Sequence, residues 1–383
     1  MSTIINARSP YYLKYTKSGE QIERVEFRIY IWSGLLSAVP TTVTYTLEKI
    51  PLVAETDNNV VIEISQLIRD YLYTDYYTDA QDAVWVRVED DIYDGDEIPT
   101  SNNQTFLAFD GFGDFEEGAN PRQSTDPTQS SYTPMVLQSN MTVYFISGRD
   151  IKIPVFSETA AIVTTDIADG KWDGNDNFWN EVNIAWQNVD NDLTITDSNN
   201  SADKIQYVIL TSEGAETGDT ITFTSTVGNS QTQVVTLVEI CEPRFDKYRS
   251  VFYNKFGALQ SFWLTKKSVI TTNVKDEKYQ SNLIDASGSS VTYNIRKHNK
   301  KRFQVLANQL ITTNTPLLKE NQNEPLEQLL VSEQVWLEET QDNALPVVIR
   351  TSNLQRKTGV NDKAMIQYSL DFEYAFNKIN DIR

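Results

Sequence analysis

The feature that most constrains this fold is a strict alternation near the end of the chain, at residues 364–377. Large apolar residues occupy one parity there, and mostly polar residues occupy the other. Because successive side chains of a strand point to opposite faces, this period of two predicts one strand with an apolar and a polar face. It would span roughly 40 Å, about twice the usual strand length. Such a strand is either the floor of a core or, with one edge open, a template for another chain.

The composition extends the β prediction to the whole chain. The 383 residues are 40% hydrophobic and 11% aromatic, which indicates a folded protein of two or three domains. Cys241 is the one cysteine, which excludes an internal disulfide and a cysteine zinc cluster. The N-terminus lacks the basic and apolar segments of a signal peptide, and no apolar run approaches 18 residues. We therefore expect no signal peptide and no membrane span.

Short alternating segments separated by turn residues predict β-sandwich modules of immunoglobulin or fibronectin type. The N-terminal sandwich is expected at 1–110, and a polar, proline-containing loop or linker at 111–135. A second sandwich is expected at 136–241. The remaining residues, 242–383, predict a β-rich α+β assembly module with one short helix. Its segment 251–264 carries five aromatic residues and reads as two strands joined by a tight turn.

Charge is unevenly distributed along the chain. The net charge is −20, yet residues 241–383 contain 20 Lys and Arg against 16 Asp and Glu, a net of +4. The first 240 residues carry 13 basic and 37 acidic residues, a net of −24. This asymmetry either serves solubility or orients neighbouring copies and partners. The acidic part disfavours a nucleic-acid partner, because phosphate contacts need clustered Lys and Arg.

The slightly basic C-terminal region contains one run of basic residues. It surrounds the single histidine, His298, for which an exposed position is the expectation. The run comprises Arg296, Lys297, Lys300, Lys301 and Arg302. The aromatic interleaving of a nucleic-acid platform is absent there, so an acidic protein partner is favoured.

The sequence carries no recognisable catalytic signature. A histidine-based triad or three-histidine metal site needs partners that His298 lacks. No phosphate-binding glycine motif occurs. Cys241 has no nearby histidine and is expected to end a buried strand. We therefore expect no enzyme activity and no cofactor.

Two acidic loops leave calcium as an alternative, because Ca²⁺ prefers oxygen ligands. Neither of the two loops matches the full EF-hand pattern, and both read equally as hairpin turns. The weak metal candidates in the first loop are Asp90, Asp91, Asp94 and Asp96. The second loop contains Asp166, Asp169, Asp173 and Asp176. Carboxylates of this kind could also serve a glycosidase, although the sequence does not give their separation.

Three segments carry a resemblance to a known class of proteins. They are residues 5–12 (INARSPYY), residues 252–263 (FYNKFGALQSFW), and residues 332–363 with their SEQVWL, PVVI, SNL and VNDK runs. Together they resemble virion structural proteins of tailed bacteriophages, particularly phages of Bacteroidetes-type hosts. The resemblance implies a ring-forming structural protein of the tail, baseplate or neck, and it implies no catalytic residues.

The leading hypothesis is therefore a non-enzymatic virion component that assembles as a homo-oligomeric ring and contacts other virion proteins. It would be made in the host cytoplasm and reside in the virion. The residues predicted to form assembly interfaces are Phe252, Tyr253, Phe256, Phe262, Trp263, Trp336, Tyr368, Phe372, Tyr374 and Phe376.

Two alternatives remain open. One is a capsid decoration or head–tail connector protein, for which the same fold is expected. The other is a carbohydrate- or receptor-binding tail module that contacts a host glycan through exposed aromatic rings. The rings that would stack on sugars are Tyr71, Tyr73, Tyr76, Tyr77, Trp172 and Trp179.

Overall fold

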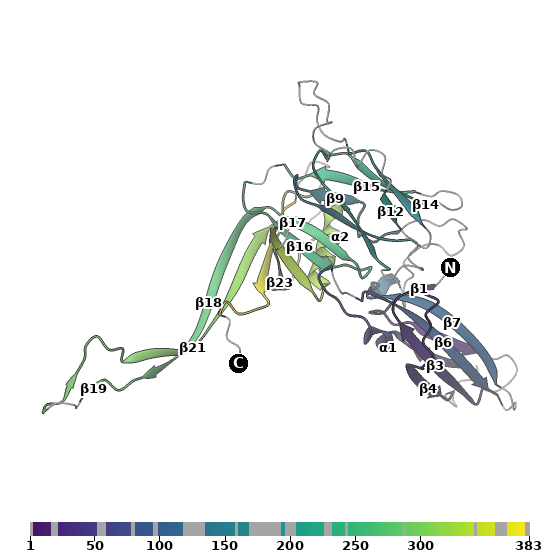
Figure 1. Ribbon diagram of the computed structural model, residues 1–383, viewed down its shortest axis with the longest axis horizontal. Helices are drawn as coiled ribbons and strands as arrows, with labels where there is room; N and C mark the ends of the chain where they lie inside the picture. The colour runs from purple at the N-terminus through teal and green to yellow at the C-terminus, as the bar shows by residue number, and fades with distance from the viewer. Residues whose placement is uncertain are drawn as a thin grey trace, which may run out of the picture. The chain divides into compact units, whose positions relative to one another are not determined.

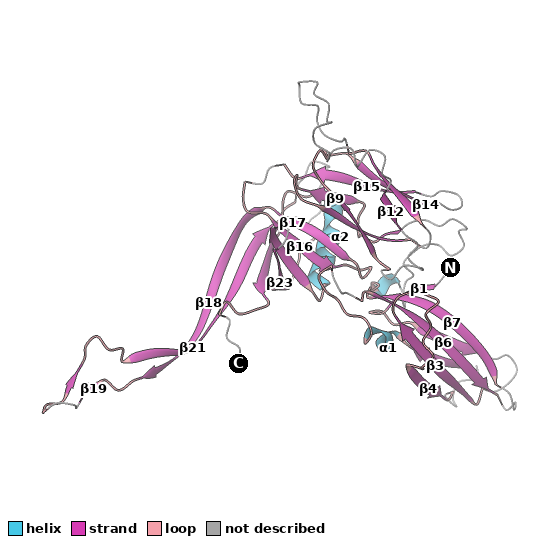
Figure 2. Cartoon of the chain, viewed as in Figure 1, coloured by secondary structure: helices cyan, strands magenta, loops and turns pink. Residues whose placement is uncertain are grey.

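The computed structural model describes most of the chain, and it confirms a mainly β fold with sandwich-like modules and a short C-terminal helix. Figure 2 shows strands throughout the described parts, with only short helices. The described residues are 3–16, 22–51, 59–77, 81–94, 99–117, 135–157, 160–167, 193–195, 204–225, 232–241, 244–285, 289–340, 343–356 and 366–379. No helix within these ranges has the length and apolar character needed to cross a bilayer.

The described chain divides into two compact units. The first contains residues 1–242 together with 251–262 and 321–333. The second contains residues 243–250, 263–320 and 334–383. Two segments of the C-terminal region, a turn and a helix, thus belong to the same unit as both sandwiches.

The N-terminal module is a two-sheet sandwich. One sheet has the strand order β1-β7-β6-β3-β4, with β1 and β7 parallel, and the other pairs β2 with β5. Alternate residues of both sheets share one core, which includes Phe27, Ile62 and Val86. Its elements are β1 (Thr3–Asn6), β2 (Tyr12–Thr16), β3 (Arg24–Trp32), β4 (Tyr45–Lys49), β5 (Asn59–Glu63), α1 (Ser65–Arg69), β6 (Ala83–Tyr93) and β7 (Thr100–Phe109).

The second sandwich repeats this topology with different residues. One sheet runs β9-β15-β14-β11-β12, again with its first pair parallel, and the other runs β8-β10-β13. Each strand of the N-terminal module corresponds to the strand numbered eight higher, so β1 corresponds to β9 and β7 to β15, and the corresponding strands have the same neighbours. The second sandwich adds β8 as an extra edge strand. The chain therefore contains a tandem structural repeat. Its strands are β8 (Met135–Val136), β9 (Thr142–Phe145), β10 (Ile151–Phe156), β11 (Ala161–Thr165), β12 (Leu193–Ile195), β13 (Gln206–Leu210), β14 (Thr220–Ser225) and β15 (Thr232–Glu239).

A further apolar cluster lies on the outer face of the N-terminal sheet. It contains Trp85 and Phe109 from that sheet, Phe156 from the second sandwich and Ala258 from the 254–258 turn. The strands β6 and β7 are therefore buried on both faces at this end, since Val86 and Phe106 face the inner core. Most of the predicted loop at 111–135 lies outside the described residues, which include only 111–117, with η1 (Phe115–Glu117), and Met135.

The second unit is built on a sheet with the order β17-β16-β22-β23-β24-β21-β18. The expectation of one long strand at 364–377 is wrong, because β24 covers only Ser369–Tyr374. It lies between β23 and β21, so both of its edges are paired within the chain. The elements of the C-terminal region, of which α2 and parts of β16 and β17 belong to the first unit, are β16 (Tyr248–Tyr253), β17 (Leu259–Leu264), β18 (Lys266–Gln280), β19 (Ile284–Asp285), β20 (Thr292–Tyr293), β21 (Lys300–Asn314), η3 (Glu320–Gln322), α2 (Asn323–Val331), β22 (Val335–Thr340), β23 (Asn343–Ile349) and β24 (Ser369–Tyr374).

Candidate assembly surface

A long two-stranded arm is the most distinctive surface of the second unit. Its strands β18 and β21 each contain 15 residues and pair antiparallel from Lys266 and Asn314 outward to Gln280 and Lys300. At about 3.4 Å per residue the pair extends roughly 50 Å. β24 covers β21 only along 310–314, so the outer parts of both strands have no further strand beside them in the described chain. Figure 1 shows the arm continuing to a tip that carries β19.

The arm exposes apolar side chains that a core would normally bury. On β18, Val269, Ile270 and Val274 are about half exposed. The tip is more open, with Tyr293 68% and Ile295 86% exposed. Unpaired strand edges combined with exposed apolar side chains form a ready template for association with another chain.

A β-bulge divides the arm into a proximal and a distal part. Lys275 pairs with Leu306 and Glu277 pairs with Phe303. Between these pairs β18 has one residue, Asp276, whereas β21 has two, Gln304 and the residue after it. Gln304 has a φ of 49°, in the left-handed region that a bulged residue can adopt. A bulge increases twist and bends the strand. We refer to residues 277–303, beyond this bulge, as the distal arm.

Two contacts stabilise the arm around the bulge. Arg302 Nε lies 2.7 Å from a carboxylate oxygen of Asp276 across the two strands. Tyr279 and Phe303 pack edge to face, with ring centroids 5.6 Å apart. An aromatic pair of this geometry contributes about 0.5–1.5 kcal/mol beyond its buried area.

The predicted basic run lies in the distal arm. Its side chains and that of His298 are all exposed. Arg302 has its partner in Asp276, whereas Arg296, Lys297, Lys300 and Lys301 have no carboxylate partner within the described ranges. The structure therefore presents these four cations to solvent beside the exposed Ile295.

Most of the residues predicted to form assembly interfaces lie inside the chain instead. Phe376 alone is exposed, at 45%, and Phe256 is half-buried. The buried ones are Phe252, Tyr253, Phe262, Trp263, Trp336, Tyr368, Phe372 and Tyr374. Their alternation and aromatic density reflect core packing, and any role in assembly stays a prediction. The sequence predicts a short strand at Lys275–Tyr279, but the length of the arm was missed, because β18 and the outer part of β21 bury neither face and show no apolar alternation. The absence of Gly and Pro from 266–280 and 300–314 was the available signal.

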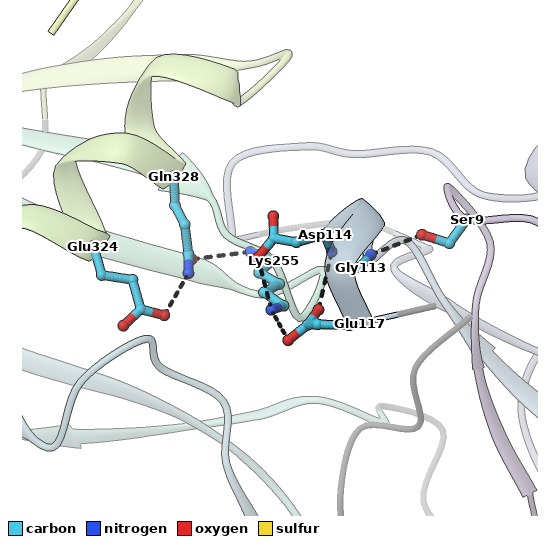
Figure 3. A network of polar contacts seen from close by, with 7 residues as sticks. All are labelled: Ser9, Gly113, Asp114, Glu117, Lys255, Glu324 and Gln328. Atoms are coloured by element: carbon cyan, nitrogen blue, oxygen red, sulfur yellow. Dashed lines mark hydrogen bonds and ion pairs between the residues drawn. The ribbon is translucent and has the colours of Figure 1, made fainter. Parts of the chain in front are cut away.

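A polar network anchors the turn between β16 and β17 to three other segments of the first unit (Figure 3). Lys255 Nζ lies 3.1 Å from Asp114 and 2.5 Å from Glu117, and its backbone N–H donates to Gln328 Oε1 on α2 at 3.1 Å. Burial disfavours the charged form of Lys255, yet the two carboxylates hold its pKa above the usual value. Gly113 N–H donates to Ser9 Oγ at 2.7 Å. The network is structural, since its charges are mutually paired.

The acidic loops give no metal constellation in the described part of the chain. Asp91 accepts hydrogen bonds from Arg28 and Ser101, both at 2.6 Å, and the Arg28 bond lowers its pKa. Asp90 is buried, which raises its pKa, and it accepts a hydrogen bond from Asn102 at 3.0 Å.

The other candidate ligands divide between described and undescribed positions. Asp94 and Asp166 are described. Asp96, Asp169, Asp173 and Asp176 lie outside the described residues. Cys241 is exposed, which corrects the expectation that it ends a buried strand.

Three of the aromatic residues suggested for sugar binding, Tyr71, Tyr76 and Tyr77, pack against other tyrosine rings. Tyr77 packs edge to face against Tyr76 and Tyr207, with ring centroids 5.0 Å apart in each pair. Tyr71 contacts Tyr45 in the same way, and Tyr73 is exposed. Trp172 and Trp179 lie outside the described residues.

Comparisons with known proteins add no functional assignment. No protein-family model matches the chain, and no curated protein matches it. Among solved structures, a similar chain is trypsin-activated alpha-2-macroglobulin from Escherichia coli, with 7% sequence identity and a TM-score of 0.21. The match covers 84% of this chain and 22% of that one, so the chain spans about a fifth of that protein's length. A likeness this distant carries no argument about function.

Proposed function

We propose that this chain is a non-enzymatic structural component of a tailed-phage virion. In this proposal it acts as a ring-forming adaptor in the tail or baseplate region and assembles through its C-terminal module. The phage context rests on the resemblance at residues 5–12, 252–263 and 332–363. The assembly role rests on one observation, the exposed arm formed by β18 and β21.

The arm supports an assembly role for a physical reason. An isolated two-stranded hairpin is marginally stable in water, and more strands or a packing partner are usually needed. The distal arm has neither within the described chain. An arm of 15-residue strands with exposed Val274 and Ile295 gains stability when another protein covers it.

Virion incorporation tests the proposal directly. In the phage that encodes the chain, residues 277–303 would be replaced by an Asn-Gly turn, which leaves the proximal arm and β24 intact. We expect the shortened chain to be made at normal levels but to be absent from purified virions by mass spectrometry. Truncation at β24 is a poorer test, because it removes an interior strand and confounds folding with assembly.

The position of the chain within the particle would come from a cryo-EM map of the virion. A ring of this chain in the tail or baseplate supports the proposal, whereas density on the capsid surface or at the neck favours the decoration or connector alternative. Absence of the chain from wild-type virions, or normal incorporation of the shortened chain, would overturn it.

A further inference from the structure

We propose that the distal arm of one copy binds the acidic end of the second sandwich in a neighbouring copy of this chain. The inference deepens the proposed ring assembly and rests on it. It names the two surfaces that meet and the chemistry that joins them.

The distal arm supplies the positive partner. Residues 277–303 contain six Lys and Arg against two Asp and Glu, a net charge of +4 within a chain of net −20. Lys297, Lys300 and Lys301 are exposed, as is the adjacent Ile295. An exposed basic segment with apolar side chains gains Coulomb energy and buried area together when it meets an acidic protein surface.

The second sandwich supplies the negative partner. The described residues between 166 and 239 contain five Asp and Glu against one Lys, a net charge of −4. The described carboxylates there include Asp166, Glu213, Asp219 and Glu239, and none of these four has a cationic partner within the described ranges. In the N-terminal module, by contrast, carboxylates such as Glu89 are paired with arginines.

Backbone and side-chain hydrogen bonds gather these carboxylates at one end of the second sandwich. Asp166 accepts from Thr220, which places the end of β11 beside the start of β14. Leu237 N–H donates to Asp219 O at 2.8 Å, which places the end of β15 beside the loop before β14. The end of β9 joins the same group, because Ile240 N–H donates to Phe145 O and Ser212 Oγ donates to Ile146 O. Residues 213 and 239 therefore lie at the same end of the sandwich, where Glu213 is exposed and Glu239 is half-buried.

The charges also select the mode of association. Two distal arms would bring like charges together, which disfavours a symmetric arm-to-arm contact. An arm-to-sandwich contact joins two different surfaces of the same chain. Repeated head to tail, a contact of this kind closes into a ring when the rotation per copy permits. The net charge of −20 disfavours nucleic acid as the occupant of the arm.

Reciprocal charge reversal tests the pairing with the full chain. One variant, K297E/K300E/K301E, reverses the arm, and another, E213K/E239K, reverses the acceptor. Sedimentation velocity would measure self-association at roughly 50 mM and 500 mM salt, because screening weakens exposed charge pairs. We expect the wild-type chain to associate at low salt, and each variant to lose at least about tenfold in association constant.

The decisive measurement is a mixture of the two variants. The acidic arm of one then meets the basic acceptor of the other, so the mixture should form heterodimers that neither variant forms alone. The control K14E/K267E/K319E makes the same change in net charge as K297E/K300E/K301E, but at exposed positions outside the distal arm. It should associate like wild type. Thermal melts would verify that all variants remain folded.

Three results would overturn the inference: a monomeric wild-type chain at low salt, association unaffected by either reversal, or no rescue on mixing. Binding of duplex DNA through the arm, in place of self-association, would also overturn it. A chain that enters virions yet shows no reciprocal rescue would refute this pairing while leaving the proposed function standing. A chain that self-associates as described but is absent from virions would refute only the proposed function.

Discussion

Gly257 lies directly against the backbone of Asp110. A β-carbon at Gly257 would lie 2.7 Å from the Asp110 carbonyl carbon and 2.9 Å from the Gly111 nitrogen. Gly257 also has a φ of +76°, which L side chains rarely adopt. A turn of the C-terminal region and the end of β7 therefore meet at a distance that glycine alone permits.

Gly257→Ala should consequently destabilise the first unit strongly. The contact is with backbone, which cannot rotate away, so we expect a loss above about 2 kcal/mol in the free energy of unfolding. Gly148→Ala is the matched control, because Gly148 has a φ of +78° but open space around its would-be β-carbon. It should lose only about 1 kcal/mol. Equal losses in urea unfolding of the two variants would contradict the close-approach argument.

The pH dependence of stability should carry a signature of Asp110. Burial raises its pKa to about 6 from an ordinary 3.8, although Arg8 and Arg69 favour its charged form. The folded state therefore retains a proton between about pH 4 and 6 that the unfolded state has released. Asp110 thus lowers stability as pH rises through this window, by on the order of 2 kcal/mol.

Asp110→Asn removes the titrating carboxyl group. The stability of the variant relative to wild type should therefore increase by about the same amount between pH 4 and pH 7. Urea titrations at both pH values would show the change. A difference between the two proteins that is independent of pH would mean that Asp110 titrates normally in the fold.

Arg249 on β16 and Glu338 on β22 form an ion pair in which each side chain is only 2% exposed. Arg249 also lies over the Trp263 ring, 5.5 Å from its centroid. Removing one member leaves a buried charge, so Arg249→Met or Glu338→Leu alone should cost about 3–5 kcal/mol. The double variant should cost less than either single change, because no charge is then left unpaired. Additive losses in this double-mutant cycle would show that the two side chains are not coupled.

Asn254 builds the turn that carries Gly257. Its side-chain oxygen accepts hydrogen bonds from the N–H groups of Phe256 and Ala258, and its amide donates to Leu137 O at 2.7 Å. Asn254→Ala should lose roughly 2–4 kcal/mol, since it leaves these buried groups without partners. Asn254→Asp keeps the acceptor but replaces the donor with a carboxylate oxygen that faces Leu137 O. We expect it to be destabilised at pH 7 and partly restored near pH 4, as measured by thermal melts. A pH-independent loss would contradict this assignment of donor and acceptor.

Local patterns in the sequence were sufficient to predict the mainly β fold. The alternation at the end of the chain places Tyr368, Leu370 and Phe372 on one buried face, as the structure has them. The turn at 255–257 between two strands was also predictable, from Gly257 within an aromatic segment. These features follow from side-chain periodicity and backbone freedom, which act over a few residues.

Position within a sheet depended instead on partners far along the chain. Only the pairing of β24 with β21 and β23 shows that its edges are closed, because strand neighbours are chosen by contacts over tens of residues. The arm escaped prediction because β18 and the outer part of β21 bury neither face, so their sequences had no need to alternate. The sequence by itself determined which side chains avoid water and where the chain can turn. The tertiary structure decided which edges and charges remain open to a partner, since that depends on what every other segment covers.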